Sequence, residues 1–148
     1  MTVEVRPVAP ADRGAWRDLF RAYGVFYETD LGDEVLDGVW AWLLDPAHDV
    51  SALVADDGGE LIGFAHIRRL NDTFTAGPGW FLDDLYVAPE RRGAGVARAL
   101  IERGYADATA AGGGTFRWIT AADNMTAQAL YDRIATRAGW VVYEKELG

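Results

Sequence analysis

The sequence lacks several residue types on which common active sites depend. It contains no cysteine, so disulfides, cysteine-bound zinc and thiol nucleophiles are all excluded. Its only two histidines, His48 and His66, exclude a histidine-rich metal site and leave little basis for a Ser–His triad. No apolar run approaches the roughly 18 residues of a membrane span, and the N-terminus MTVEVRPVAP does not resemble a signal peptide. We therefore expect no metal and no membrane partner, and a cytoplasmic location.

Basic residues are also scarce. Fourteen Lys and Arg stand against 23 Asp and Glu, which gives a formal net charge of −9. A phosphate backbone would be repelled by the chain as a whole, so we expect no nucleic-acid partner. Half of the residues are apolar and 12% are aromatic, which is too much for a disordered chain. The 148 residues fit one ordinary domain, expected to span 1–148.

The spacing of apolar residues switches between the periods of a strand and of a helix. It predicts strands around 3–5 and over 51–55, 61–69, 80–87, 115–120 and 140–147, and helices from Pro10, over 33–44, from Ala94 and over 126–137. Asp57-Gly58-Gly59 separates two of these strands and is typical of a hairpin turn. The order β α α β β β α β α β predicts a mixed α/β (α+β) fold, with antiparallel strands first and a crossover later.

The segment with the most residues typical of a binding site lies where the strand over 80–87 leads into the next helix. Gly93 and Gly95 can adopt positive φ and let a ligand approach the backbone. The free N–H groups and the dipole of the helix start form an anion site, and Arg92 adds a cation. A dinucleotide fingerprint would need glycine where Arg98 stands, and no Walker A string occurs. A loop without function and a site for another phosphate ligand are the alternatives.

The remaining pattern is Arg92-x-x-Gly95-x-Ala97, preceded by Leu85-Tyr86-Val87-x-Pro89. It resembles the GNAT superfamily of acyl-CoA-dependent N-acyltransferases, whose core motif lies at such a strand-to-helix turn. Asn124, Ala127 and Leu130-Tyr131 match a second motif of that family. The resemblance implies a GNAT-like domain with a central twisted mixed β-sheet flanked by about four helices, and acetyl-CoA as the cofactor. It assigns cofactor binding to Leu85, Tyr86, Val87, Arg92, Gly93, Ala94, Gly95, Val96, Ala97 and Asn124.

The same resemblance implies how protons would move. Tyr131 matches the general acid that protonates the departing thiolate, although an aromatic in an apolar stripe is more often a core residue. Asp83 and Asp84 match the position of a carboxylate that takes a proton from the amine, directly or through a water. Strand alternation places the two on opposite faces, and we favour Asp83 as the base. The alternative is that both carboxylates only solvate an edge. His66 shares a strand face with Phe64 and is interpreted as a structural histidine.

The acceptor is expected to be an amine. In GNAT proteins the first two helices and their loop form a substrate wall, and here Phe26, Tyr27 and Glu28 combine aromatic rings with a carboxylate. Such a wall favours a small cationic amine, an amino acid or a lysine-type amine. Many GNAT domains end with two strands, whereas only one is expected here after the last helix. The sheet edge left uncovered could pair with a second copy of the chain, which predicts a homodimer. The alternative function is a non-catalytic acyl-CoA-binding regulatory module on the same fold.

Overall fold

A computed structural model describes residues 2–148. Their contacts divide the chain into two compact units, one ending at Trp118 and the other running from Ile119 to Gly148. The elements of the first unit are β1 (Glu4–Pro7), α1 (Arg13–Phe26), α2 (Asp33–Leu44), β2 (Val50–Asp57), β3 (Glu60–Asp72), β4 (Gly77–Val87), α3 (Val96–Ala110) and β5 (Phe116–Arg117), with short 3₁₀ turns at Pro10–Asp12 and Pro89–Arg91. The second unit contains α4 (Met125–Ile134).

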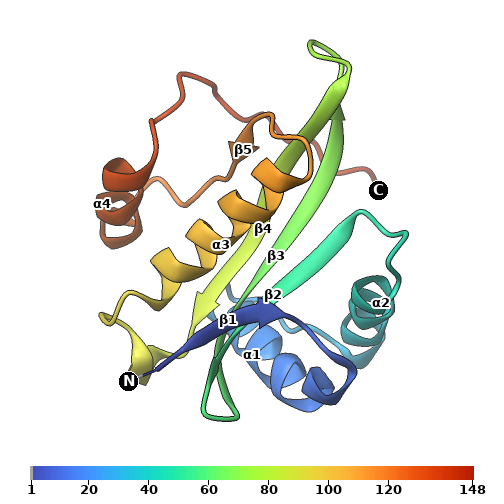
Figure 1. Cartoon of the computed structure of the whole chain (residues 1–148), viewed down its shortest axis with the longest axis vertical. Helices are drawn as coiled ribbons and strands as arrows, with labels where there is room; N and C mark the ends of the chain where they lie inside the picture. The colour runs from blue at the N-terminus through green and yellow to red at the C-terminus, as the bar shows by residue number, and fades with distance from the viewer. Residues whose placement is uncertain (1) are drawn as a thin grey trace. The chain divides into compact units, whose positions relative to one another are not determined.

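The five strands form one mixed sheet in the order β1-β2-β3-β4-β5 (Figure 1). β1 to β4 pair antiparallel with their neighbours, and β5 pairs parallel with β4, so the predicted crossover is confirmed. Gly58 and Gly59 turn β2 into β3 with positive φ at both positions, as a two-residue hairpin of this hand requires. The predicted mixed fold with four helices is therefore confirmed.

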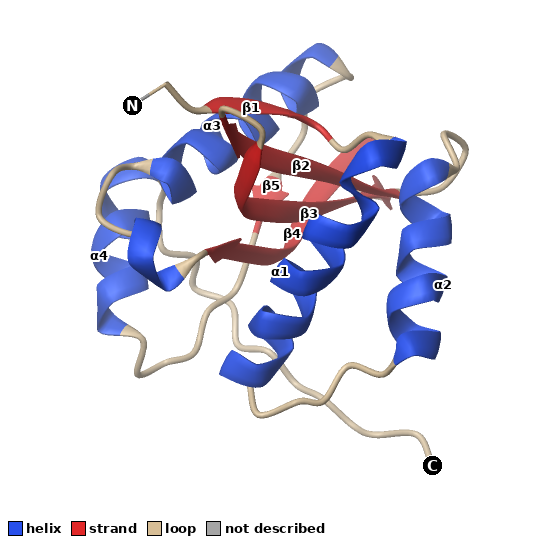
Figure 2. Cartoon of the chain, turned by 90° about the horizontal axis from the view of Figure 1, so that it is seen from below, coloured by secondary structure: helices blue, strands red, loops and turns tan. Residues whose placement is uncertain are grey.

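The sheet of the first unit carries helices on both faces (Figure 2). On one face, α1 and α2 bury an aromatic-rich core that includes Trp16, Trp40 and Phe64. On the other face, α3 packs Leu100 and Ile101, both almost fully buried, against the sheet. Gly104 lets α3 come close, because a Cβ there would stand 3.0 Å from the Ile67 Cδ1 atom and 3.1 Å from the Phe116 ring. None of the helices described within 2–148 is long and apolar enough to cross a bilayer.

The predicted strand over 140–147 is wrong, because this segment contains no regular structure. A strand persists only when a neighbour satisfies its backbone groups. The second unit has a helix but no strand in its described residues, and Trp140, Val141 and Tyr143 remain highly exposed. The predicted strand over 115–120 is likewise reduced to Phe116–Arg117.

Three predicted helix boundaries also shift. The helix expected from Pro10 begins as a 3₁₀ turn over Pro10–Asp12, and the α-helix starts at Arg13. The helix expected from Ala94 begins at Val96, because Gly95 adopts a left-handed φ of 83° and cannot extend the α-helical turn. The helix expected over 126–137 ends at Ile134, and Ala135 follows it in an extended conformation.

Two glycine substitutions test this backbone. Gly114→Ala is expected to lower the free energy of unfolding by about 2 kcal/mol or more, because its φ is +101° and a Cβ would stand 2.1 Å from the Pro78 carbonyl oxygen. Gly38→Ala, inside α2 with open space around it, is expected to raise that free energy by about 0.5–1 kcal/mol. Urea unfolding measures both, and a Gly114→Ala protein of unchanged stability would contradict the close approach of Gly114 to β4.

Candidate active site

The end of β4 leads through a 3₁₀ turn into α3. Gly93 and Gly95 have φ of 86° and 83°, and a Cβ at either position would meet nothing within 4 Å. The first α3 hydrogen bond runs from the Ala99 N–H to the Gly95 carbonyl, 3.0 Å between N and O. The amide groups before it lie at the positive end of the helix dipole. The backbone here is thus open to an anion such as a phosphate.

The two arginines of the turn are held by other groups of the protein. Arg92 donates from Nε to the Val87 carbonyl oxygen at 2.8 Å, and its guanidinium lies over the rings of Tyr86 and Phe26. Arg91 pairs with Asp57 at the end of β2. The turn is therefore tied to β4 and to the β2–β3 hairpin, and its glycine backbone faces open space.

The backbone of β4 has one edge that extends beyond β5. In the described residues, β5 pairs with β4 only through Trp80↔Phe116 and Phe81↔Arg117. The Ala88 N–H donates to the Ile62 carbonyl of β3, so by alternation the N–H groups of Leu85 and Val87 point to the opposite edge. That edge can accept an extended ligand in the way that a sheet accepts an added strand.

A β-bulge in β4 determines where the two acidic side chains point. His66 pairs with Asp84 and Ile67 pairs with Leu82, so Asp83 is an extra residue without a partner in the ladder. Asp84 contacts His66 and Asp83 contacts Arg68, and these two β3 residues lie on the same strand face. The expectation that Asp83 and Asp84 point to opposite faces is therefore wrong, because the bulge interrupts the alternation.

The two carboxylates have different partners. Both oxygens of Asp83 accept from Arg68, at 3.0 Å from Nε and 2.9 Å from Nη2, and this pairing raises the pKa of Arg68. Oδ2 of Asp84 lies 2.8 Å from Nδ1 of His66, a side chain that is 2% exposed. Nε2 of His66 accepts a hydrogen bond from the Trp16 indole at 2.9 Å. His66 is thus a satisfied buried histidine, as its strand position predicts, and it also contacts Asp84.

Tyr23 of α1 lies beside Asp84 and belongs to a cluster of aromatic side chains. Burial raises the pKa of Tyr23, and the neighbouring Asp84 carboxylate and Tyr27 raise it further. The Tyr23 ring lies 4.9 Å from that of Tyr27 and 6.1 Å from that of Tyr86, measured between centroids. Phe26 and Tyr27 are about half exposed, so one side of this cluster is open. Glu28 follows them at the surface with a φ of 56°.

The first unit therefore brings together most of the predicted site. The glycine turn, the β4 edge, both carboxylates and the aromatic wall lie around the end of β4 and of α1. Sequence reasoning missed Trp16, Tyr23 and Arg68. Arg68 could have been predicted from the pairing of β3 with β4, because the long hairpin and its bulge place Arg68 beside Asp83.

The other two predicted residues, Asn124 and Tyr131, belong to the second unit. Asn124 caps α4, with its side-chain oxygen accepting from the Ala127 N–H at 3.1 Å. Tyr131 lies on α4 and is partly buried. Its carbonyl accepts from the Ala135 N–H, which closes the last turn of the helix.

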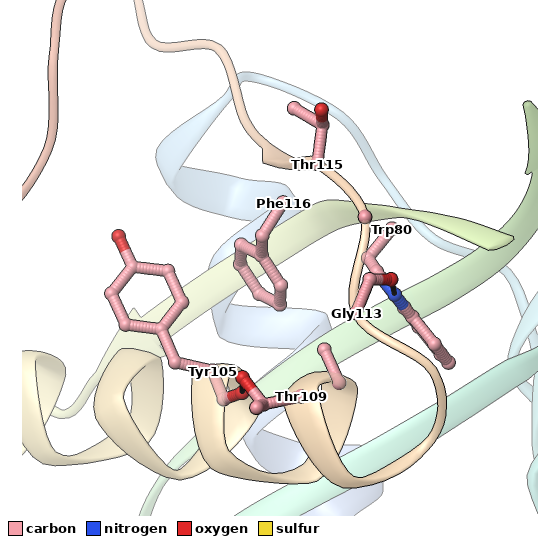
Figure 3. A pocket seen from close by; sticks show the side chains of 8 residues that line it. Trp80, Tyr105, Thr109, Gly113, Thr115 and Phe116 are labelled. Atoms are coloured by element: carbon pink, nitrogen blue, oxygen red, sulfur yellow. Dashed lines mark hydrogen bonds between the residues drawn. The ribbon is translucent and has the colours of Figure 1, made fainter. Parts of the chain in front are cut away.

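A separate pocket of about 390 Å³ lies at the C-terminal end of α3 (Figure 3). Its wall includes Trp80, Tyr105, Thr109 and Phe116, and none of the predicted site residues lines it. Trp80 donates from its indole nitrogen to the Gly113 carbonyl at 2.8 Å. This pocket is distinct from the glycine turn at the N-terminal end of the same helix.

Comparisons with known proteins agree with this geometry. The sequence profile of the Acetyltransferase (GNAT) family matches residues 14–135. The D-amino-acid N-acetyltransferase HPA3 of Saccharomyces cerevisiae is 32% identical over 145 residues, 97% of this chain and 90% of the relative. An aminoglycoside N(6')-acetyltransferase type 1 of Stenotrophomonas maltophilia is 34% identical over 100 residues, 66% of this chain and 61% of the relative. The structure of AAC(6')-Iy with a CoA-containing bisubstrate analogue superposes with a TM-score of 0.86 at 20% identity, covering 100% of both chains.

The raised pKa of Tyr23 predicts a pH dependence of stability. An unfolded tyrosine ionises near its ordinary pKa of about 10, whereas folded Tyr23 stays neutral to higher pH. The contribution of Tyr23 is thus fully present below pH 10 and is lost as pH rises above it. Tyr23→Phe is expected to flatten this decline in urea unfolding between pH 8 and 11, by up to about 1.4 kcal/mol per pH unit. Tyr143→Phe, at a side chain 92% exposed, is expected to keep the wild-type slope; equal slopes for all three proteins would contradict the assignment.

Proposed function

Because the chain belongs to the acetyltransferase (GNAT) family and is an acyltransferase of that class, we propose that it moves an acetyl group from acetyl-CoA to a primary amine. The amine attacks directly in a ternary complex, since the chain has no cysteine that could carry the acetyl group covalently. The observation that carries the proposal is the position of Asp84, which lies beside Tyr23 of the aromatic cluster on the strand that leads into the glycine turn.

The residues of the glycine turn fit the diphosphate of a CoA molecule. Gly93 and Gly95 hold the backbone in conformations that suit glycine, and the space beside each is open. The amides from Arg92 to Ala97 would hold the diphosphate, the backbone of Leu85 and Val87 would pair with the pantetheine arm, and Asn124 would bind that arm as well. When bound, acetyl-CoA supplies the acetyl group as an activated thioester.

The two carboxylates have different roles in the proposed deprotonation of the acceptor amine. An amine with a pKa near 10 must lose a proton before it attacks. Asp83 is neutralised by Arg68, whereas the partner of Asp84 is a histidine, so we assign the base to Asp84, acting directly or through a water. Asp83, favoured by the sequence alone, becomes a neighbour that holds Arg68 in place. Tyr131 would supply a proton from its hydroxyl to the leaving sulfur.

The acceptor proposed is a small cationic amine, an amino acid or a lysine-type amine. Relatives of this chain are named for D-amino acids and for aminoglycosides, which are all small molecules with amino groups. The exposed rings of Phe26 and Tyr27, the carboxylate of Glu28 and the net charge of −9 would attract such a cation.

Two further features remain proposals. The whole of 1–148 is proposed to act as one GNAT-type domain in the cytoplasm. A homodimer is proposed because the segment after α4 exposes Trp140, Val141 and Leu147, apolar side chains that a second copy would cover.

The proposed function is tested by CoA release from acetyl-CoA with a panel of D- and L-amino acids, polyamines, aminoglycosides and lysine-rich peptides. Turnover is expected with one of these classes. Asp84→Asn is expected to lower kcat by about 10²- to 10⁴-fold, the usual loss for a general base. Asp83→Asn is the matched control and is expected to cause a smaller loss, because its carboxylate is paired with Arg68.

The opposite ranking of the two variants would return the base role to Asp83. Acetyl-CoA binding by calorimetry without turnover on any amine would favour the non-catalytic binding module. Absence of acetyl-CoA binding would overturn the proposal.

Tyr131→Phe tests the acid. Removal of the hydroxyl is expected to lower kcat about 10²-fold or more while the KM for acetyl-CoA stays the same, since the ring and its packing are kept. Tyr143→Phe, in the exposed segment after α4, serves as the control. Unchanged turnover of Tyr131→Phe on the best acceptor would remove Tyr131 from the mechanism.

A further inference from the structure

His66 is a buried side chain, 2% exposed, that contacts Trp16 of α1 through one ring nitrogen and Asp84 of β4 through the other. Its ring contacts those of Phe20 and Phe64, each with 4.7 Å between centroids. Both ring nitrogens have polar partners, with Trp16 at Nε2 and Asp84 at Nδ1. Trp16 is itself 0% exposed, so water cannot take its place at Nε2.

The partners of His66 determine where its proton lies. An indole N–H can only donate, so Nε2 of His66 must accept from Trp16 and carries no proton. The single proton of the neutral ring is therefore on Nδ1 and is donated to Oδ2 of Asp84. An imidazolium would place its Nε2–H against the indole N–H, and two donors cannot pair. Trp16 thus opposes protonation of the ring that contacts Asp84.

We propose that Trp16 and His66 are positioning residues, which orient Asp84 and keep its negative charge from being cancelled. The inference rests on the proposed role of Asp84 as the base that receives the proton of the amine. A protonated His66 would form an ion pair with Asp84, much as Arg68 does with Asp83, and would weaken the attraction of the carboxylate for a proton. The neutral ring holds Oδ2 in place without adding a positive charge.

Other groups around Asp84 are compatible with this arrangement. From α1, Tyr23 faces it, and the raised pKa of Tyr23 keeps that phenol protonated. On its own face of the sheet, the charged side chains include Asp83 and Arg68, which pair with each other, and Arg92, whose guanidinium lies over the ring of Tyr86 and donates to the Val87 carbonyl. The two nitrogens of His66 therefore offer the most direct way to alter the charge beside Asp84.

Two substitutions of similar size separate the two contacts of His66. The amide of Asn reaches the position of Nδ1 and can donate to Asp84, whereas the amide of Gln reaches the position of Nε2 and can accept from Trp16. His66→Gln is expected to lower kcat about tenfold or more, the scale on which outer partners of a site act, with an unchanged KM for acetyl-CoA. The acidic limb of its kcat/KM profile is expected to move to higher pH, because the carboxylate loses a donor that favours its charged form. His66→Asn, which keeps a donor to Asp84, is expected to retain most of the wild-type kcat and the wild-type pH profile.

Nuclear magnetic resonance tests the inference without any acceptor. Long-range ¹H–¹⁵N correlations of the two imidazoles, with His48→Gln for assignment, are expected to show His66 as the neutral Nδ1–H form throughout the active pH range. The ¹³C signal of the Asp84 carboxylate is expected to titrate at higher pH in His66→Gln than in the wild type and His66→Asn. An imidazolium or an Nε2–H form of His66, or identical behaviour of the Gln and Asn variants, would overturn the inference. A wild type that acetylates no amine would instead overturn the proposed function, while these spectra would still decide the state of His66.

Discussion

The extra residue in β4 is the constraint on which the arrangement of the site depends. A regular strand would send the two adjacent aspartates to opposite faces, and one of them would enter the α3 core. With Asp83 outside the β3–β4 ladder, both carboxylates face α1, and the pairing resumes at Asp84. Beyond the bulge, Leu85 and Val87 then present their N–H groups at the edge that β5 leaves uncovered. One inserted residue thus sets both the acidic face of the strand and the edge that is proposed to bind the cofactor.

Placing two carboxylates side by side would be costly if both kept their charge unopposed. The two contacts on β3 differ, since Arg68 forms an ion pair with Asp83, whereas Asp84 contacts His66, the ring that we infer to be neutral. The more buried of the two acids, Asp84, is consequently the one whose carboxylate is not paired with an arginine. Burial raises the pKa of the adjacent Tyr23, so this phenol adds no competing negative charge.

The sequence predicted well those features that depend only on interactions between neighbouring residues in the chain. The glycine turn and the Gly58-Gly59 hairpin each depend on a few neighbouring residues, and both are present. The predictions that failed depend on partners distant in the sequence. A bulge arises from how two strands pair, so the side-chain directions of Asp83 and Asp84 could not be read from alternation. The strand predicted over 140–147 has suitable residues but no neighbouring strand within its unit.

Helix α1 connects the two halves of the proposed chemistry. One of its buried residues, Trp16, fixes the proton of His66, while Tyr23 lies against Asp84 and Phe26 ends the helix in the open aromatic wall. The spacing of these residues follows the helical repeat, so they share one face toward the sheet. A shift of α1 that moved the wall of Phe26 and Tyr27 would therefore also disturb the hydrogen bond from Trp16 to His66, the residue proposed to orient Asp84. In the proposed mechanism, acceptor choice and base positioning are therefore coupled through one helix, and changes at the exposed Phe26 and Tyr27 are the expected route to a different amine.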